Sequence, residues 1–238
     1  MNALAKPVSK LPDVGTTIFT VMSALASEQG ALNLSQGFPD FDGPESLLQA
    51  VNDHMCSGQN QYPPMAGVAA LRETIAEKVL DLYGLACDAD TEVTVTAGAT
   101  EALFCAIAAV VHAGDEVIVL DPAYDSYDPV IRLQGAVPVH VPLMAPAYRI
   151  DWDRIEAAIT VNTRLLILNS PHNPTGMVMD ESDIGALSAL CSKYDIYLIG
   201  DEVYEHMVFD QAKHLSLCGY AELYARSFVI SSFGKTYH

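Results

Sequence analysis

Short runs of consecutive apolar residues alternate with helix-like repeats along most of the chain. The runs VIVL at 117–120, LLIL at 165–168 and IYLI at 196–199 contain no charged residue. A strand that is apolar on both faces is buried between two layers, as in a sheet covered by helices on each side. The pattern therefore predicts an α/β fold, a three-layer sandwich with a mostly parallel sheet.

The same pattern gives the expected elements. Helical spacing begins near Pro44 and is clearest over residues 67–82. One apolar face of that helix would consist of Val68, Leu71, Ile75, Val79 and Leu82. Further helices are expected over residues 101–112, 126–133, 151–159 and 181–193, and strands over residues 92–96, 116–120, 137–141, 164–168, 196–199 and 228–231. Residues 1–45, rich in Gly, Pro and polar side chains, are expected to form an irregular arm.

Composition excludes several classes of function. The 238 residues include 12 Lys or Arg and 30 Asp or Glu, for a net charge of −18, which opposes nucleic-acid binding by a basic surface. The longest uncharged apolar stretch, residues 102–113, is shorter than the roughly 20 residues that span a bilayer. The polar N-terminus does not resemble a signal peptide, so a cytoplasmic location is expected. The five scattered cysteines indicate reduced, mostly buried thiols, with neither a zinc site nor a disulfide framework.

Candidate chemistry follows the ends of the expected strands, which is where ligands bind in parallel sheets. In TAGATEAL (96–103), Gly98 permits a tight turn and Thr100 adds a hydroxyl at a helix N-terminus, an arrangement that suits a phosphate. In DPAYDSY (121–127), Tyr124 could stack on a flat ring. Taken alone, each segment is better explained as an ordinary turn.

Two further segments carry polar groups in similar places. In NSPHNPTG (169–176), a rigid turn presents Asn173, which could bond a phenolate oxygen or a carboxylate, or could cap the turn itself. His172, between the two prolines, is expected to be exposed. Asp201 ends the apolar run at 196–199 and needs a partner such as a protonated ring nitrogen, unless it caps the next helix. Tyr204 could reach a phenolic oxygen of the same ring.

The glutamates that follow Asp201, Glu202 and Glu205, are expected to face solvent. Lys235, one of six lysines, follows the last expected strand among small and apolar residues. Burial there would favour the neutral, nucleophilic amine that bonds an aldehyde cofactor. The alternative is a surface lysine at a strand end.

In their order and approximate spacing, these segments together with DEVY (201–204) and SSFGKTYH (231–238) resemble the fold type I, pyridoxal-phosphate-dependent aminotransferases of class I/II. LSQGFPDF (34–41) and NQYPPMAGVAALR (60–72) agree. The nearest resemblance is to the subgroup of bacterial methionine aminotransferases and kynurenine–glutamine transaminases. The resemblance implies that Lys235 forms a Schiff base with the cofactor and shuttles the substrate proton.

The resemblance also implies the other contacts. Asp201 would pair with the pyridine nitrogen, and Tyr124 would stack on the ring. Asn173 and Tyr204 would bond the ring oxygen O3′, and Asn173 would also face the substrate carboxylate. The remaining implied residues are Ala99, Thr100 and Ser232 at the phosphate, Tyr62 at the phosphate of the neighbouring subunit of a homodimer, and Gly37 at the substrate carboxylate.

The implied activity is transamination between an L-amino acid of methionine or aromatic type and a 2-oxo acid. Residues 1–45 would form an N-terminal arm at the substrate entrance and part of a small domain, and residues 46–238 a cofactor-binding large domain, incomplete at its C-terminal end. The family's chains are longer, and this sequence ends three residues after Lys235, so a truncated form with impaired activity is expected. The alternatives are a C–S β-lyase, a non-catalytic cofactor-binding fragment and a plain α/β domain.

Overall fold

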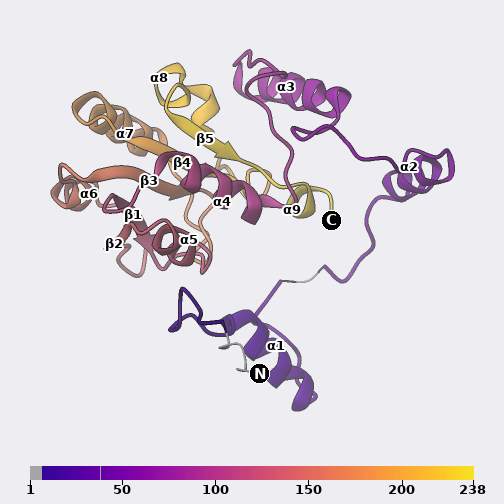
Figure 1. Cartoon of the computed structure of the whole chain (residues 1–238), viewed down its shortest axis with the longest axis horizontal. Coiled ribbons are helices and arrows are strands. Elements are labelled where there is room, and N and C mark those ends of the chain that lie inside the picture. The colour runs from indigo at the N-terminus through magenta and orange to yellow at the C-terminus, as the bar shows by residue number, and fades with distance from the viewer. Residues whose placement is uncertain (1–6, 38) are drawn as a thin grey trace, which may run out of the picture. The chain divides into compact units, whose positions relative to one another are not determined.

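The computed structural model describes residues 7–37 and 39–238, and Phe38 and the first six residues lie outside the description. The chain forms two compact units, the first ending at Asp42 and the second comprising Gly43–His238 (Figure 1). The first unit contains helix α1 (Ile18–Glu28), whose N-cap Thr17 accepts a hydrogen bond from the Thr20 N–H at 3.4 Å. The expectation of an irregular arm is therefore wrong for these residues, because a capped run without Gly or Pro forms a helix.

The second unit is built on a five-stranded sheet, and all its pairings among the described residues are parallel. The strand order is β2-β1-β3-β4-β5. In this register Asn169 of β3 lies beside Asp201 of β4, which in turn lies beside Ile230 of β5. The strands are β1 (Glu116–Asp121), β2 (Val137–Pro142), β3 (Thr163–Asn169), β4 (Tyr197–Asp201) and β5 (Ser227–Ile230).

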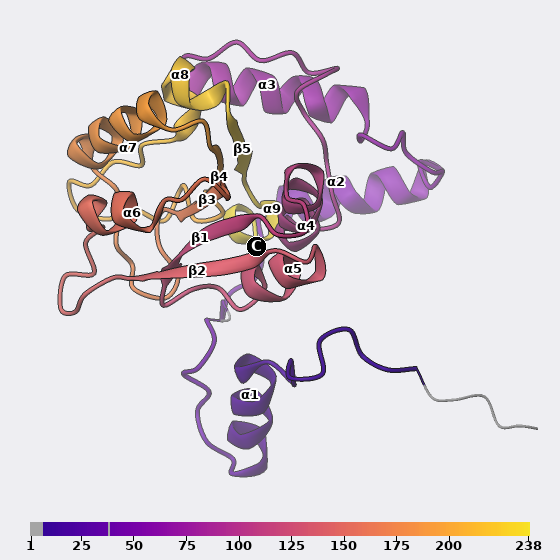
Figure 2. The same cartoon turned by 60° about the vertical axis from the view of Figure 1, so that its left-hand side comes forward.

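Helices cover both faces of this sheet (Figures 1 and 2). Val117 and Val119 pack with side chains of α4 and α5 on one face, whereas Ile118 and Leu120 pack with α6, α7 and α8 on the other. The expected three-layer α/β sandwich is confirmed, because strands that are apolar on both faces need a layer on each. These helices are α4 (Ala99–Val110), α5 (Tyr127–Leu133), α6 (Trp152–Ala158), α7 (Glu181–Lys193) and α8 (Ala221–Tyr224).

The remaining helices of the second unit are α2 (Glu45–Cys56), α3 (Ala69–Tyr83), η1 (Leu217–Gly219) and α9 (Phe233–Thr236). Helix α3 confirms the expected helix over residues 67–82 and ends at Gly84, whose φ of +74° suits a residue without a Cβ. Its apolar face is only partly covered: Ile75 and Val79 are half-buried, but Val68, Leu71 and Leu82 are exposed.

The expected strand over residues 92–96 does not form within the described part of the chain. The Val95 N–H donates to the Ala66 carbonyl at 2.9 Å, but no described strand runs alongside to complete a ladder. Strand propensity alone therefore does not make a strand here, since pairing and packing provide most of its stability.

Two expectations drawn from composition are also tested by the structure. Cys191 and Cys218 are buried, but Cys56 and Cys105 are exposed, so the expectation of mostly buried thiols is wrong. All five cysteines are free. Among the described residues, no helix has both the length and the apolar composition that a membrane span needs.

The turn after β3 packs more tightly than its sequence indicates. The His172 N–H donates to the Met177 carbonyl at 2.8 Å, and the ring nitrogen Nδ1 lies 2.9 Å from Thr175 Oγ1. His172 is only 4% exposed, so the expectation of an exposed histidine is wrong. Burial lowers the pKa of His172 to about 4, because the imidazolium is poorly solvated there.

This burial makes stability depend on pH. An unfolded histidine takes up a proton below about pH 6.5, whereas folded His172 stays neutral down to about pH 4. The free energy of unfolding should therefore fall between these pH values, by up to about 3 kcal/mol from this group. In His172→Gln the fall, measured by urea unfolding at several pH values, should be shallower by about that amount. The exposed control His54→Gln should keep the wild-type slope, and an unchanged slope in His172→Gln would contradict the assignment.

Candidate functional site

The carboxyl ends of the parallel strands bring the candidate residues to one edge of the sheet. Tyr124 follows β1, Asn173 follows β3, and Tyr204 follows β4. Ser232 and Lys235 follow β5, and Lys235 lies in the short helix α9. The parallel register accounts for this convergence, because every strand ends at the same edge.

Asp201 ends β4, which lies between β3 and β5, and is only 3% exposed. The Tyr127 hydroxyl donates to its Oδ2 at 2.5 Å, and the Val203 N–H lies 3.5 Å from its Oδ1. Burial raises the pKa of Asp201, although the Tyr127 hydrogen bond and the charge of Lys235 oppose the rise. A carboxylate this deeply buried is well suited to accept a charged N–H donor from a ligand.

An aromatic pair connects Asp201 to the start of α4. The rings of Tyr127 and Tyr124 meet edge to face, with centroids 5.7 Å apart. The Tyr124 hydroxyl lies 3.3 Å from the Thr100 hydroxyl. Thr100 stands in the first turn of α4, next to Ala99 and after Gly98, whose φ of +84° lies where only glycine is unstrained. The first N–H groups of this 12-residue helix, with these hydroxyls, can bind an anion.

Asn169 connects Asn173 to the strand of Asp201. Its side-chain amide donates to the Asp201 carbonyl at 2.7 Å, and its Oδ1 accepts the Asn173 N–H at 2.6 Å. The sequence pattern did not single out Asn169 or Tyr127. The signal for Asn169 was available, because it is a polar residue that ends an apolar strand, as Asp201 is. Tyr127 has no comparable signal, since its role depends on how α5 packs.

Lys235 and Tyr204 come together, but the lysine is not buried. Its Nζ lies 5.6 Å from the centroid of the Tyr204 ring, a cation–π distance. Of the two alternatives that the sequence left open, the surface lysine is the one observed, because the described residues leave α9 at the surface, with Phe233 and Tyr237 also exposed. Ser232 is half-buried and stands immediately before α9.

Two expected residues lie apart from this cluster. Tyr62 is fully exposed in the loop between α2 and α3 and makes no hydrogen bond within the part of the chain that the structure describes. Gly37 belongs to the first unit, whereas the cluster around Asp201 belongs to the second.

The two glutamates after Asp201 are not at the surface. Glu202 and Glu205 are each 4% exposed and accept hydrogen bonds from distant segments. The expectation that they face solvent is therefore wrong. Burial of a carboxylate requires such donors, and those donors come from parts of the chain that sequence spacing does not connect.

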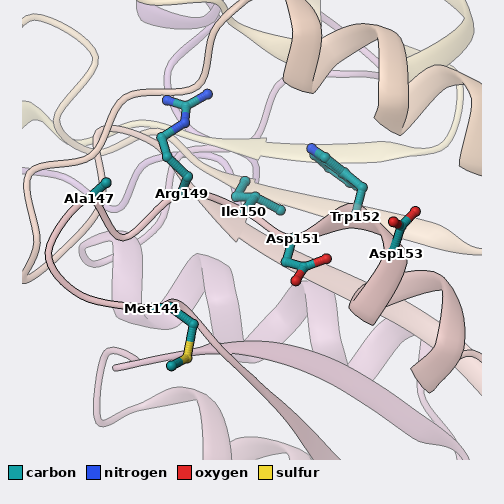
Figure 3. Close-up of a pocket in the computed structure, with 7 residues that line it drawn as sticks. All are labelled: Met144, Ala147, Arg149, Ile150, Asp151, Trp152 and Asp153. Atoms are coloured by element: carbon teal, nitrogen blue, oxygen red, sulfur yellow. The ribbon is translucent and has the colours of Figure 1, made fainter.

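A cavity of about 420 Å³ lies among the residues drawn in Figure 3. It contains none of the candidate site residues. Its one cationic side chain, Arg149, is already bound to Asp180 and Asp183 at 2.7 and 2.5 Å. The cavity therefore offers no free group for an anionic ligand. Its lining residues are Met144, Ala147, Arg149, Ile150, Asp151, Trp152 and Asp153.

Comparison with known proteins gives consistent matches. The model of the family "Aminotransferase class I and II" matches residues 29–238. Methionine aminotransferase of Escherichia coli (strain K12) is 53% identical over 232 residues, which cover 98% of this chain and 60% of that protein. The probable N-succinyldiaminopimelate aminotransferase of Mycobacterium tuberculosis is 46% identical over 97% of this chain and 59% of its own length.

A solved structure agrees with these matches. The crystal structure of YbdL from Escherichia coli, described as having a methionine aminotransferase function, superimposes with a TM-score of 0.95 and 52% identity. The match covers 98% of this chain and 61% of that one, so the chain spans about 60% of the length of the relatives it matches. Since the family match extends over most of the sequence, the chain belongs to the class I and II aminotransferases, a pyridoxal-phosphate-dependent family.

Proposed function

We propose that this chain carries the cofactor site of an aminotransferase that moves an amino group between an L-amino acid of methionine or aromatic type and a 2-oxo acid. The observation that supports this best is the convergence at one sheet edge of a buried carboxylate, an edge-to-face tyrosine pair, an open helix N-terminus and a lysine. The methionine preference rests on the name of a relative that is 53% identical.

The residues present fit pyridoxal phosphate. Asp201 would accept a hydrogen bond from the protonated ring nitrogen, which would give this carboxylate a cationic donor in addition to Tyr127. Tyr124 would lie against the ring. The N–H groups at Ala99 and Thr100, together with the hydroxyls of Thr100 and Ser232, would hold the phosphate. When bound, the cofactor supplies an electron-poor ring that withdraws electrons from the amino acid Cα.

Side chains of this chain would move the substrate proton and orient the cofactor and the substrate. The Lys235 amine would bond the cofactor aldehyde. Once the substrate amine replaces it, the freed amine would take a proton from the substrate Cα and deliver it to the cofactor carbon that carried the aldehyde. Asn173, fixed through Asn169, would donate to the cofactor O3′ and face the substrate carboxylate. Tyr204, beside the Lys235 amine, would also donate to O3′.

Tyr62 would connect this site to a neighbouring subunit. A fully exposed tyrosine is available to reach the phosphate of a neighbouring copy, which would make a homodimer the functional unit. Gly37 would lie at the substrate carboxylate. Residues 1–45 would serve as the arm at the substrate entrance and residues 46–238 as the cofactor domain, in the cytoplasm.

Residues 1–238 alone are expected to bind the substrate carboxylate weakly. Most arginines are paired elsewhere, so few cations remain for that carboxylate and we expect slow turnover by residues 1–238. The pairs are Arg72–Asp90, Arg149–Asp180, Arg149–Asp183, Arg154–Asp151, Arg164–Asp115 and Arg226–Asp195.

The assignment of Lys235 is tested by incubation with pyridoxal phosphate, reduction with borohydride, and peptide mass analysis. Reduction turns the bond between the aldehyde and a lysine amine into a stable adduct. We expect one adduct, on Lys235, lost in Lys235→Ala and kept in Lys213→Ala, which removes another exposed lysine. Equal labelling of several lysines, or an unchanged adduct mass in Lys235→Ala, would contradict the proposal.

The assignment of Asp201 predicts a loss of affinity. Asp201→Asn removes the charge that would face the ring nitrogen, which costs about 2–5 kcal/mol for a buried charged pair. The Kd for pyridoxal phosphate should rise at least roughly 30-fold, measured by absorbance titration. Asp125→Asn, on the exposed loop beside Tyr124, is the control and should bind as wild type does. The same Kd in both variants would show that Asp201 does not face the cofactor.

The reaction class is tested by product analysis. With methionine and a 2-oxo acid, the expected products are the 2-oxo acid of methionine and a new amino acid, formed with ping-pong kinetics. Ammonia and pyruvate from cystathionine, without an acceptor, would instead indicate a C–S β-lyase. Cofactor binding without any amino-group transfer in a single turnover would indicate a non-catalytic module.

A further inference from the structure

Glu205 joins three separate segments through one buried carboxylate. Lys78 Nζ of α3 lies 2.5 Å from its Oε1, and the Tyr83 hydroxyl, at the end of the same helix, donates to its Oε2. The Ser231 hydroxyl, just after β5, also donates to Oε1. Burial raises the pKa of Glu205, but the hydrogen bonds from Lys78, Ser231 and Tyr83 outweigh it and lower the pKa overall. The carboxylate therefore stays charged at neutral pH.

Both ends of this connection adjoin the proposed site. Glu205 directly follows Tyr204, and Ser231 directly precedes Ser232, four residues before Lys235. Lys235 stands in α9, a helix of only four residues at the surface, and so short a helix has little stability of its own. A hydrogen bond from Ser231 to an anchored carboxylate is a strong, charge-assisted one, so it can determine where α9 begins.

We propose that Glu205 is a positioning residue for Lys235. Held to α3 by Lys78 and Tyr83, its carboxylate fixes Ser231 and thereby sets where the Lys235 amine lies relative to Tyr204 and Asp201. The inference rests on the proposed function of Lys235, since positioning matters only if that amine reacts. It adds a residue that never touches the cofactor and acts through Ser231.

Glu202 provides a matched control. It is as buried as Glu205, and it accepts hydrogen bonds from His214 Nε2 at 2.8 Å and from the Leu217 N–H at 2.9 Å. It has no hydrogen bond to Ser231 among the described residues. Loss of its charge disturbs a buried carboxylate of the same kind but leaves the connection to α9 intact.

The test compares wild type with Ser231→Ala, Ser231→Thr, Glu205→Gln and Glu202→Gln. Two quantities are measured: hydrogen exchange of the amides at 232–237 in the cofactor-free chain, and the rate and pH profile of borohydride-trapped labelling at Lys235. We expect Ser231→Ala and Glu205→Gln to speed exchange and slow labelling by about tenfold each, the effect of losing a charge-assisted hydrogen bond. Ser231→Thr should keep both near their wild-type values, and Glu202→Gln should leave the exchange of residues 232–237 unchanged.

The alternative is that Glu205 only holds α3 against the sheet and has no effect on Lys235. In that case Ser231→Ala, which keeps the Lys78 and Tyr83 contacts, would behave as wild type, and the proposal would be overturned. Tenfold faster exchange of these amides in Glu202→Gln would also overturn it, and so would a Ser231→Thr variant that behaves as Ser231→Ala does. If wild type itself is not labelled at Lys235, the proposed function fails instead, and the exchange data still decide whether Glu205 holds the segment. Ser231→Ala keeps the test available if Glu205→Gln does not fold.

Discussion

A carboxylate buried at the end of an interior parallel strand constrains the whole candidate site. Asp201 has almost no contact with water, and an isolated charge in such a place is unstable without donors. The Tyr127 hydroxyl supplies one donor, and the Asn169 amide fixes the backbone of Asp201 from the neighbouring strand. The register of β3 against β4 sets the second contact, so the sheet positions the carboxylate before any ligand arrives.

The rest of the site extends outward from this point. Tyr127 leads through Tyr124 to Thr100 at the start of α4, while Asn169 leads to the turn that carries Asn173. Along one sheet edge the cluster therefore places, in spatial order, a site for an anion, an aromatic face and a buried carboxylate. A planar, phosphorylated ring with a protonated nitrogen has matching chemistry in the same order. Lys235 is held less firmly, and Glu205, acting through Ser231, provides the anchor that its short helix lacks.

The sequence was informative wherever neighbouring residues determine the structure. The apolar runs at 165–168 and 196–199 predicted β3 and β4, and strand ends pointed to Asn173 and Asp201. It was uninformative where contacts between distant segments determine burial. Glu205 is buried because Lys78, 127 residues away, reaches it, and Tyr127 meets Asp201 across 74 residues. Residues 92–96 have strand-like side chains, but no described strand pairs with them. The exposure of Lys235 depends likewise on what packs over α9, which its own segment does not reveal.

A crystal structure of the chain grown with pyridoxal phosphate would test whether Asp201 is the partner of a cofactor ring nitrogen. We expect the ring nitrogen within about 3 Å of an Asp201 carboxylate oxygen, the phosphate at the N-terminus of α4, and electron density continuous with Lys235 Nζ. A cofactor bound elsewhere, with Asp201 still bonded only to Tyr127 and the Val203 N–H, would contradict this assignment.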